Sequence, residues 1–235
     1  MNDYGIFIYT THKNYSRCQK ILETWGSKID NIYFYTDKDY EDERFIKVND
    51  DDSYESNVTK NLFAIIDAQK KGHDWSLFIG DDNYLFKKNF EKYISSENVL
   101  DNLIYGEEIS GTWPTDRKLS YIDGASGILF NKTSLDNYIP KINKNLETYR
   151  KLEFADVVIE LIRKETNVEK KQTNANFHSG GLYFCGTAPW DNPQHTHHRA
   201  ITFHYLEEGL VNGWNFDKLY EYDLWENKSY SYNLS

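Results

Sequence analysis

Two adjacent carboxylates follow an apolar stretch in the first half of the chain. Asp81 and Asp82 stand in the turn Gly80-Asp81-Asp82-Asn83, directly after the apolar run 75–79. Crowded carboxylates repel each other and lose hydration, and a divalent cation such as Mn²⁺ or Mg²⁺ relieves that cost while keeping positions free for phosphate oxygens. Because side chains alternate in extended backbone, we expect only one of the two to reach the ion. The alternative is a solvated turn without a ligand.

A third carboxylate, Asp156, lies near the start of the segment 155–163, whose apolar residues recur with a helical period. A carboxylate in that position can act as the N-cap of the helix. The same location would also hold a general base, with its pKa adjusted by partial burial. The local sequence leaves both interpretations open.

Small residues form the loop Gly124-Ala125-Ser126-Gly127. Such residues let the backbone approach a ligand closely, and their N–H groups can bind phosphate or sugar oxygens. A tight loop before a helix is the alternative interpretation.

The second half of the chain also contains several histidines. His195, His197 and His198 lack the spacing of a helical two-histidine metal site, which favours a surface loop. His204 lies in a strand-like apolar run, where a hydrogen-bonded structural histidine is expected, although a neutral imidazole there could also complete a carboxylate-rich metal site. His178 is the next option for such a ligand.

The elements that must position these groups alternate between strand and helix. Short apolar runs predict strands, and apolar residues at helical spacing predict helices. Alternation of this kind predicts an α/β fold with a mainly parallel sheet flanked by helices, in which ligands bind beyond the carboxyl ends of the strands. The predicted strands are 4–9, 31–35, 44–48, 75–79 and 201–205, and the predicted helices are 15–25, 58–70, 132–138, 155–163 and 214–222.

Composition narrows the classes of function. The 235 residues include 27 Lys and Arg against 37 Asp and Glu, for a net charge of −10, which argues against a nucleic-acid partner. Two cysteines exclude a disulfide scaffold. The longest apolar stretches are too short to cross a bilayer, and the N-terminus lacks the pattern of a signal peptide, so we expect a cytoplasmic protein, bacterial or viral in origin, without a transmembrane segment. The sequence does not indicate an oligomeric state.

Taken in order, these motifs resemble the core 1 β1,3-galactosyltransferases and the Fringe-like glycosyltransferases. The similarity spans nearly the whole chain and includes a helix with Arg17 and Trp25-Gly26, a lysine at position 60, the segment 75–84 around the acidic turn, the loop 121–130, the Ala155-Asp156-Val157 triplet and the closing Phe203-His204-Tyr205. In two places the chain departs from the family: Gly80 replaces the first acidic residue of a triplet, and Ala155 replaces a glutamate.

The resemblance implies one GT-A domain over 1–235, with a nucleotide-sugar half (1–85) and an acceptor and catalytic half (86–235). It makes Asp82 and His204 ligands of Mn²⁺ or Mg²⁺ and Asp156 the catalytic base. The residues that it implies for binding the UDP-sugar donor are Thr10, Thr11, Arg17, Asp37, Lys60, Asp81, Gly124 and Ala125.

The expected activity is therefore inverting, metal-dependent transfer of a hexose from a UDP-sugar to a hydroxyl of a glycan, glycolipid or glycoprotein, with a β1,3 linkage of galactose or N-acetylglucosamine. Trp113 and Trp190, whose flat faces suit sugar rings, and His178 are candidates for the acceptor side. The alternatives are a sugar- or nucleotide-binding relative without catalysis and a metal-dependent hydrolase.

Overall fold

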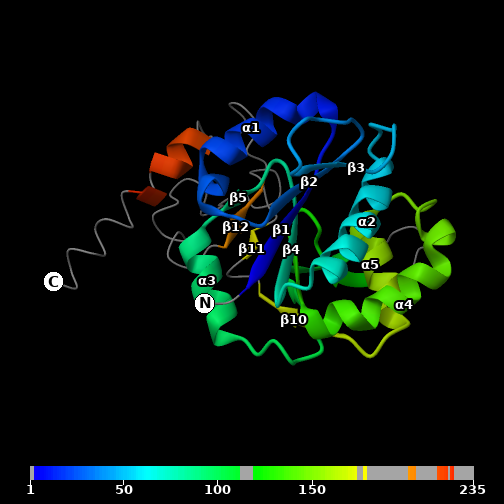
Figure 1. The fold of residues 1–235 in the computed structure, drawn as a ribbon. Helices are drawn as coiled ribbons and strands as arrows, with labels where there is room; N and C mark the ends of the chain where they lie inside the picture. The colour runs from blue at the N-terminus through cyan, green and yellow to red at the C-terminus, as the bar shows by residue number, and fades with distance from the viewer. Residues whose placement is uncertain are drawn as a thin grey trace.

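A seven-stranded sheet forms the centre of the computed structural model, which describes residues 3–111, 119–173, 177–178, 201–204, 216–221 and 223–224. The strand order is β10-β6-β9-β4-β1-β2-β3, and β9 runs antiparallel to both of its neighbours while the other pairings are parallel. The predicted α/β class with a mainly parallel sheet is confirmed (Figure 1). The strands of this sheet are β1 (Tyr4–Tyr9), β2 (Ile32–Thr36), β3 (Phe45–Lys47), β4 (Trp75–Gly80), β6 (Leu103–Gly106), β9 (Ile128–Asn131) and β10 (Glu169–Gln172).

Helices cover both faces of this sheet because the central strands are apolar on both sides. In β1, Phe7 packs into the core under α2 (Ser56–Lys71), α4 (Lys132–Tyr149) and α5 (Ala155–Lys164), whereas Ile6 and Ile8 pack against α1 (Tyr15–Glu23) and α3 (Lys87–Ser96). This two-residue alternation is the expected one for a strand buried between two helical layers. Figure 1 shows the two groups of helices on opposite sides of the sheet.

Two small sheets complete the described fold and lie near the carboxyl end of β4. One joins β11 (Phe177–His178), β12 (Thr202–Phe203) and β5 (Tyr84–Leu85), and the other pairs β7 (Glu108–Gly111) with β8 (Leu119–Ile122). The pairing of β12 with β5 is antiparallel and sets Phe203 opposite Tyr84. This register brings the segment after β12 to the acidic turn that precedes β5.

The secondary structure predicted from the sequence agrees best with the structure in the first 85 residues. Each strand and helix predicted there exists, with ends shifted by a few residues. In the second half, the sequence missed β6 to β10 and α3. The helix predicted to end at 138 continues to Tyr149. It contains Pro140 and bends at Asn145 (φ −124°, ψ 15°). The predicted final helix is present over 216–221.

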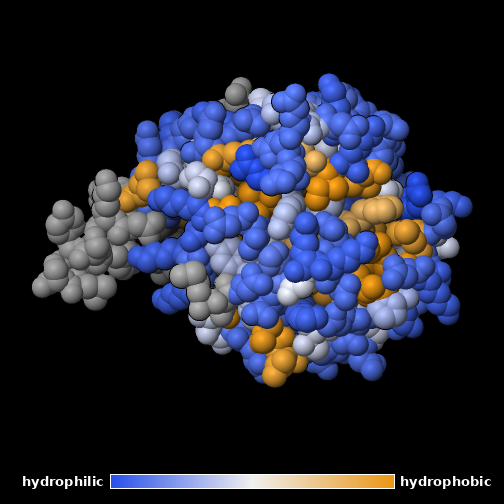
Figure 2. All heavy atoms as spheres, in the orientation of Figure 1, coloured by the Kyte–Doolittle hydropathy of each residue, from blue (hydrophilic) through white to orange (hydrophobic). Residues whose placement is uncertain are grey.

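Figure 2 shows hydrophilic residues over most of the face seen in Figure 1, with apolar residues exposed where α2, α4 and α5 pack together. Within the described residues, no helix combines the length and the apolar character that crossing a membrane requires.

Candidate functional site

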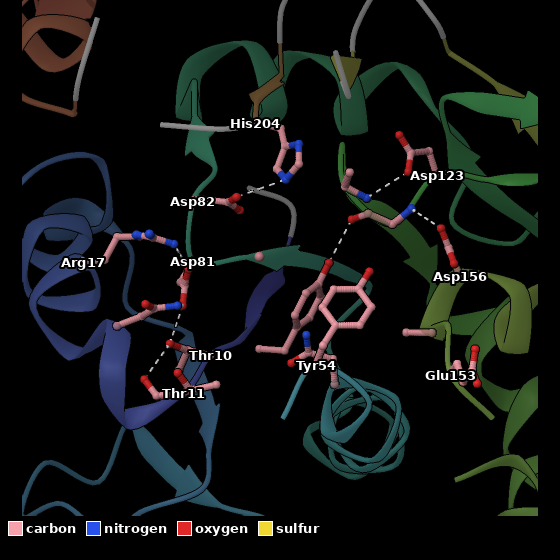
Figure 3. Close-up of a pocket in the computed structure, with 17 residues that line it drawn as sticks. Thr10, Thr11, Arg17, Tyr54, Asp81, Asp82, Asp123, Glu153, Asp156 and His204 are labelled. Atoms are coloured by element: carbon pink, nitrogen blue, oxygen red, sulfur yellow. Dashed lines mark hydrogen bonds and ion pairs between the residues drawn. The ribbon is translucent and has the colours of Figure 1, made fainter. Parts of the chain in front are cut away.

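A polar cleft of about 420 Å³ opens at the carboxyl ends of β1 and β4. Its walls come from segments far apart in the sequence: the residues after β1 and β4, the starts of α1, α2 and α5, the turn between β8 and β9, and His204 (Figure 3). The volume lies in the range typical of small-molecule sites, roughly 300–1,000 Å³. This is the edge of the sheet at which the sequence predicted a ligand.

Asp82 and His204 meet at one end of this cleft. The Nε2 atom of His204 lies 3.1 Å from Oδ2 of Asp82, and both side chains are mostly buried (Figure 3). The antiparallel pairing of β12 with β5 causes this approach, because it places the residue after Phe203 beside the residues before Tyr84. Burial opposes ionisation of Asp82, but the hydrogen bond and the charge of His204 hold the pKa of this carboxyl below its ordinary value.

The carboxylate of Asp81 points away from this pair and is hydrogen-bonded by other side chains of the protein. Its Oδ1 atom accepts a hydrogen bond from Arg17 at 2.7 Å, and its Oδ2 atom accepts from Thr10 at 2.5 Å and from Asn14 at 3.0 Å. Burial raises the pKa of Asp81, and the charge of Arg17 opposes that rise. Asp81 therefore joins the end of β4 to the end of β1 and the start of α1. Both carboxylates line the cleft, and Asp82 is the one that meets His204.

Asp156 lies on the opposite side of the cleft, in the first turn of α5. The N-cap position belongs to Phe154, so the interpretation of Asp156 as an N-cap is wrong; its carboxylate instead accepts from the N–H of Val157 at 2.8 Å and of Gly124 at 3.5 Å. Burial raises the pKa of Asp156 to about 6, with the nearby charge of Asp123 adding to the rise. A carboxylate with that pKa is ionised at neutral pH and can still accept a proton.

The small-residue loop supports these carboxylates. The N–H of Ala125 donates to Oδ1 of Asp123 at 3.1 Å, and the carbonyl of Gly124 accepts from the hydroxyl of Tyr9 at 2.9 Å. A Cβ atom on Gly124 would lie 3.3 Å from Cβ of Asp156, a tight contact, so the loop lies close against α5 at this position. The loop N–H groups that we expected to bind ligand oxygens thus donate to Asp123 and Asp156.

Of the other residues that the resemblance assigned to donor binding, some line the cleft and some do not. Thr10, Thr11 and Arg17 line the cleft. Asp37 and Lys60 do not: the Asp37 carboxylate accepts from the backbone N–H of His12 at 2.8 Å and lies 3.8 Å from the buried Nζ of Lys60, whose pKa burial lowers.

Three acceptor-side predictions have no described side chain. Trp113 and Trp190 lie outside the described residues. His178 belongs to β11, of which only the backbone is described.

Sequence reasoning missed several residues of the cleft. Tyr54 lies two residues before α2 and Asn57 in its first turn, and Glu153 lies two residues before α5. Because Tyr54 and Glu153 precede the helices, helical spacing in the sequence does not reveal them. The cleft residues absent from the sequence-based prediction are Tyr9, Asn14, Tyr54, Asn57, Asp123 and Glu153.

The pair of Asp82 and His204 has the chemistry and spacing that a divalent cation needs from two adjacent ligands. Neighbouring ligands of an octahedral ion at about 2.1 Å are roughly 3 Å apart, and the observed separation is 3.1 Å. Among the described residues no group of three or more His, Cys, Asp or Glu side chains forms a metal cluster. Asp82 and His204 would be two of the ligands of such an ion.

Gly80, the departure from the acidic triplet, has a physical reason in this geometry. A Cβ atom at this position would lie 2.8 Å from Oδ1 of Asp82. Any side chain at position 80 would thus displace the carboxylate of Asp82 from its present place. Glycine preserves the approach of Asp82 to His204.

Comparison with known proteins identifies the architecture. No protein-family model and no curated protein matches the sequence. The galactosyltransferase LgtC, solved with donor and acceptor sugar analogues, aligns over 93% of this chain and 95% of its own with a TM-score of 0.51 and 11% identity. The apo form of the glycosyltransferase GlyE from Streptococcus pneumoniae TIGR4 aligns over 99% of this chain and 64% of its own, with a TM-score of 0.50 and 12% identity. The chain has a GT-A fold.

A glycosyltransferase involved in glycosylation of the major capsid of PBCV-1 also aligns, over 93% of this chain and 98% of its own, with a TM-score of 0.46 and 14% identity.

In the GT-A fold of this chain, the cleft lies beyond the carboxyl ends of β1 and β4, where ligands of open α/β sheets bind.

Proposed function

We propose that this protein is a metal-dependent glycosyltransferase that moves a hexose from a UDP-sugar to an acceptor hydroxyl with inversion at the anomeric carbon. One observation carries the proposal: a single cleft of a GT-A fold holds the pair Asp82 and His204 at one side and Asp156, with its raised pKa, at the other. The solved galactosyltransferase and glycosyltransferase of the same fold support the reaction class.

The donor would lie on the side of Asp82 and His204. These two residues would hold Mn²⁺ or Mg²⁺, which supplies neutralising charge for the diphosphate of the leaving group. Arg17 is the one Lys or Arg side chain that lines the described cleft, and Thr11 adds a hydroxyl beside it. Both groups suit the phosphate oxygens of a UDP-sugar.

The acceptor hydroxyl would approach from the side of Asp156. Its oxygen forms the new bond to the anomeric carbon while the bond from that carbon to the UDP oxygen breaks, and the carboxylate of Asp156 takes the hydroxyl proton. Attack from the face opposite UDP inverts the anomeric configuration. A base of this kind typically contributes about 10²- to 10⁴-fold to the rate, and a pKa of about 6 keeps Asp156 ionised at neutral pH.

The experiment is a UDP-release screen with the full chain. UDP-galactose, UDP-N-acetylglucosamine and UDP-glucose are each incubated with a mixture of neutral sugar acceptors, once with Mn²⁺ and once with EDTA. We expect Mn²⁺-dependent UDP release that rises with acceptor. Proton NMR of the product gives the anomeric configuration and shows whether the linkage is β1,3, as the resemblance implies.

The two alternatives give other results in the same screen. A binding protein without catalysis would bind UDP-sugar and release no UDP. A hydrolase would cleave phosphate or ester substrates without an acceptor and without protection by UDP. A product with retained configuration would remove Asp156 from the role of base while leaving sugar transfer in place.

A further inference from the structure

Tyr54 presents an aromatic ring to solvent at the edge of the cleft. Its exposed fraction is 65%, although it lies among the residues that line the cavity. Large aromatic side chains are usually buried because their exposure leaves apolar area in water. At the edge of the cleft, this exposure leaves part of the ring available to a ligand.

The ring is held in place from one side. Tyr54 meets Phe154 edge to face, with ring centroids 6.0 Å apart and an interplanar angle of 62°. Phe154 is the N-cap residue of α5, so this contact joins the loop before α2 to the helix that carries Asp156. In Figure 3 the side chain of Tyr54 points into the space between the two acidic sides of the cleft. A ring oriented in this way offers a face at little entropic cost.

Two polar side chains line the same cleft as this ring. Asn57 lies in the first turn of α2, and Glu153 lies two residues before α5. The amide and the carboxylate can hydrogen-bond to the hydroxyls of a sugar that stacks on the tyrosine.

The negative charge on the Asp156 side of the cleft favours neutral over anionic acceptors. Asp123, Glu153 and Asp156 line the cleft near Tyr54, and Arg17 belongs to the donor side, bound to Asp81. A carboxylate on the acceptor would be repelled by these three side chains. A neutral sugar unit has no charge for these carboxylates to repel, and its hydroxyls can donate hydrogen bonds to them.

We propose that Tyr54 is the stacking platform of the acceptor subsite and that the acceptor is a neutral sugar, with Glu153 accepting from its hydroxyls. The inference rests on the proposed function and names the acceptor class of the same cleft. Tyr54 contacts Phe154, two residues before Asp156, and both Tyr54 and Asp156 line the cleft, so a sugar on this ring would lie on the side of that carboxylate.

The experiment compares the wild-type chain with Tyr54→Ala, Tyr54→Phe and the control Phe63→Ala, which removes a 38% exposed ring of α2 outside the cleft. Saturation-transfer NMR with UDP and Mn²⁺ present measures binding of lactose, maltose and cellobiose, and of glucuronic acid as the anionic probe. Donor hydrolysis to water is measured in parallel, and thermal unfolding verifies that each variant is folded.

We expect Tyr54→Ala to weaken binding of the best neutral disaccharide by roughly three- to tenfold, as loss of one aromatic contact implies, and to raise the acceptor KM by the same factor. Tyr54→Phe and Phe63→Ala stay within about twofold of wild type, and donor hydrolysis is unchanged in the control Phe63→Ala. Glu153→Gln reduces the preference for neutral sugars over glucuronic acid.

Three results overturn the inference. The first is equal disaccharide binding by wild type and Tyr54→Ala, including the case in which wild type binds none of the three. The second is a loss of UDP affinity in Tyr54→Ala without a change in disaccharide binding, which would place the nucleotide base on this ring. The third is tighter binding of glucuronic acid than of neutral sugars. Failure of the proposed function is a different outcome, in which no UDP-sugar is turned over. The two outcomes can be told apart because disaccharide binding is measured without turnover.

Discussion

Replacing Asp156 by asparagine is expected to make the protein more stable and much less active. The carboxylate is buried enough for its pKa to rise from 3.8 to about 6 in the folded chain. Asparagine has nearly the same shape, still accepts the N–H of Val157 through its amide oxygen, and carries no charge to desolvate. The variant thus isolates the cost of holding this charge in the cleft.

The expected gain in the free energy of unfolding follows from the raised pKa of Asp156. A difference of about 2.2 pKa units corresponds to about 3 kcal/mol at about 1.36 kcal/mol per unit. Loss of the long contact with the N–H of Gly124 at 3.5 Å removes part of this gain, at most about 1 kcal/mol. We therefore expect the free energy of unfolding of Asp156→Asn to exceed that of wild type by about 2 kcal/mol at pH 8.

The pH dependence has a definite sign. Because the pKa of Asp156 is higher in the folded than in the unfolded chain, the folded state binds more protons between about pH 4 and pH 6, and wild-type stability falls as the pH rises through this window. Above pH 7 both states are ionised and the whole penalty is present. Below about pH 4 both states are protonated and the advantage of Asp156→Asn disappears.

Urea unfolding of the ligand-free chain at several values between pH 4 and pH 8 measures this difference, with Glu153→Gln as the control for removing a more exposed carboxylate. The reasoning is refuted if Asp156→Asn is no more stable than wild type at pH 8, or if the two differ equally at both ends of the range. In the transfer assay, wild-type activity should decline tenfold per pH unit below about pH 6, and Asp156→Asn should lose about 10²- to 10⁴-fold.

Three further substitutions test the remaining parts of the site. His204→Ala should weaken Mn²⁺ binding in the presence of UDP by at least about tenfold in calorimetry, and an unchanged affinity would require another ligand. Gly80→Ala should also reduce Mn²⁺ affinity while the chain stays folded, because its Cβ atom displaces the carboxylate of Asp82; tight binding by this variant would contradict that geometry. Arg17→Ala should cost about 3 kcal/mol in urea unfolding, since it leaves the buried carboxylate of Asp81 without its cation, whereas a loss under 1 kcal/mol would show that Thr10 and Asn14 suffice.

Local patterns determined the elements of the first half. The runs at 4–9 and 75–79 are short and apolar on both faces, so they predict buried parallel strands, and both strands exist. The acidic turn that follows 75–79 was predictable as a ligand-binding place because it ends a central strand. The same reasoning failed for β6 to β10, since each of these strands has only four residues, the lower limit of a run in which alternation can be recognised.

Only the tertiary structure decided how the carboxylates divide their work. The spacing of Asp81 and Asp82 does not tell them apart, and only the resemblance to known glycosyltransferases assigned Asp82 to the metal. In the structure, the strand end at Gly80 turns Asp81 toward Arg17 and Asp82 toward His204. The distance between Asp82 and His204 depends on the pairing of β5 with β12, which joins segments far apart in the chain and leaves no trace in either one alone.

The aromatic residue at the edge of the cleft illustrates the same limit. Sequence patterns identified tryptophans as sugar-stacking candidates from residue type, whereas Tyr54 gained that role from its exposed ring and its contact with Phe154. Residue type and spacing determine which elements form, because these depend on neighbours along the chain. Which side chains share a cleft depends on strand pairing and helix packing between distant segments, and these are decided by the whole fold.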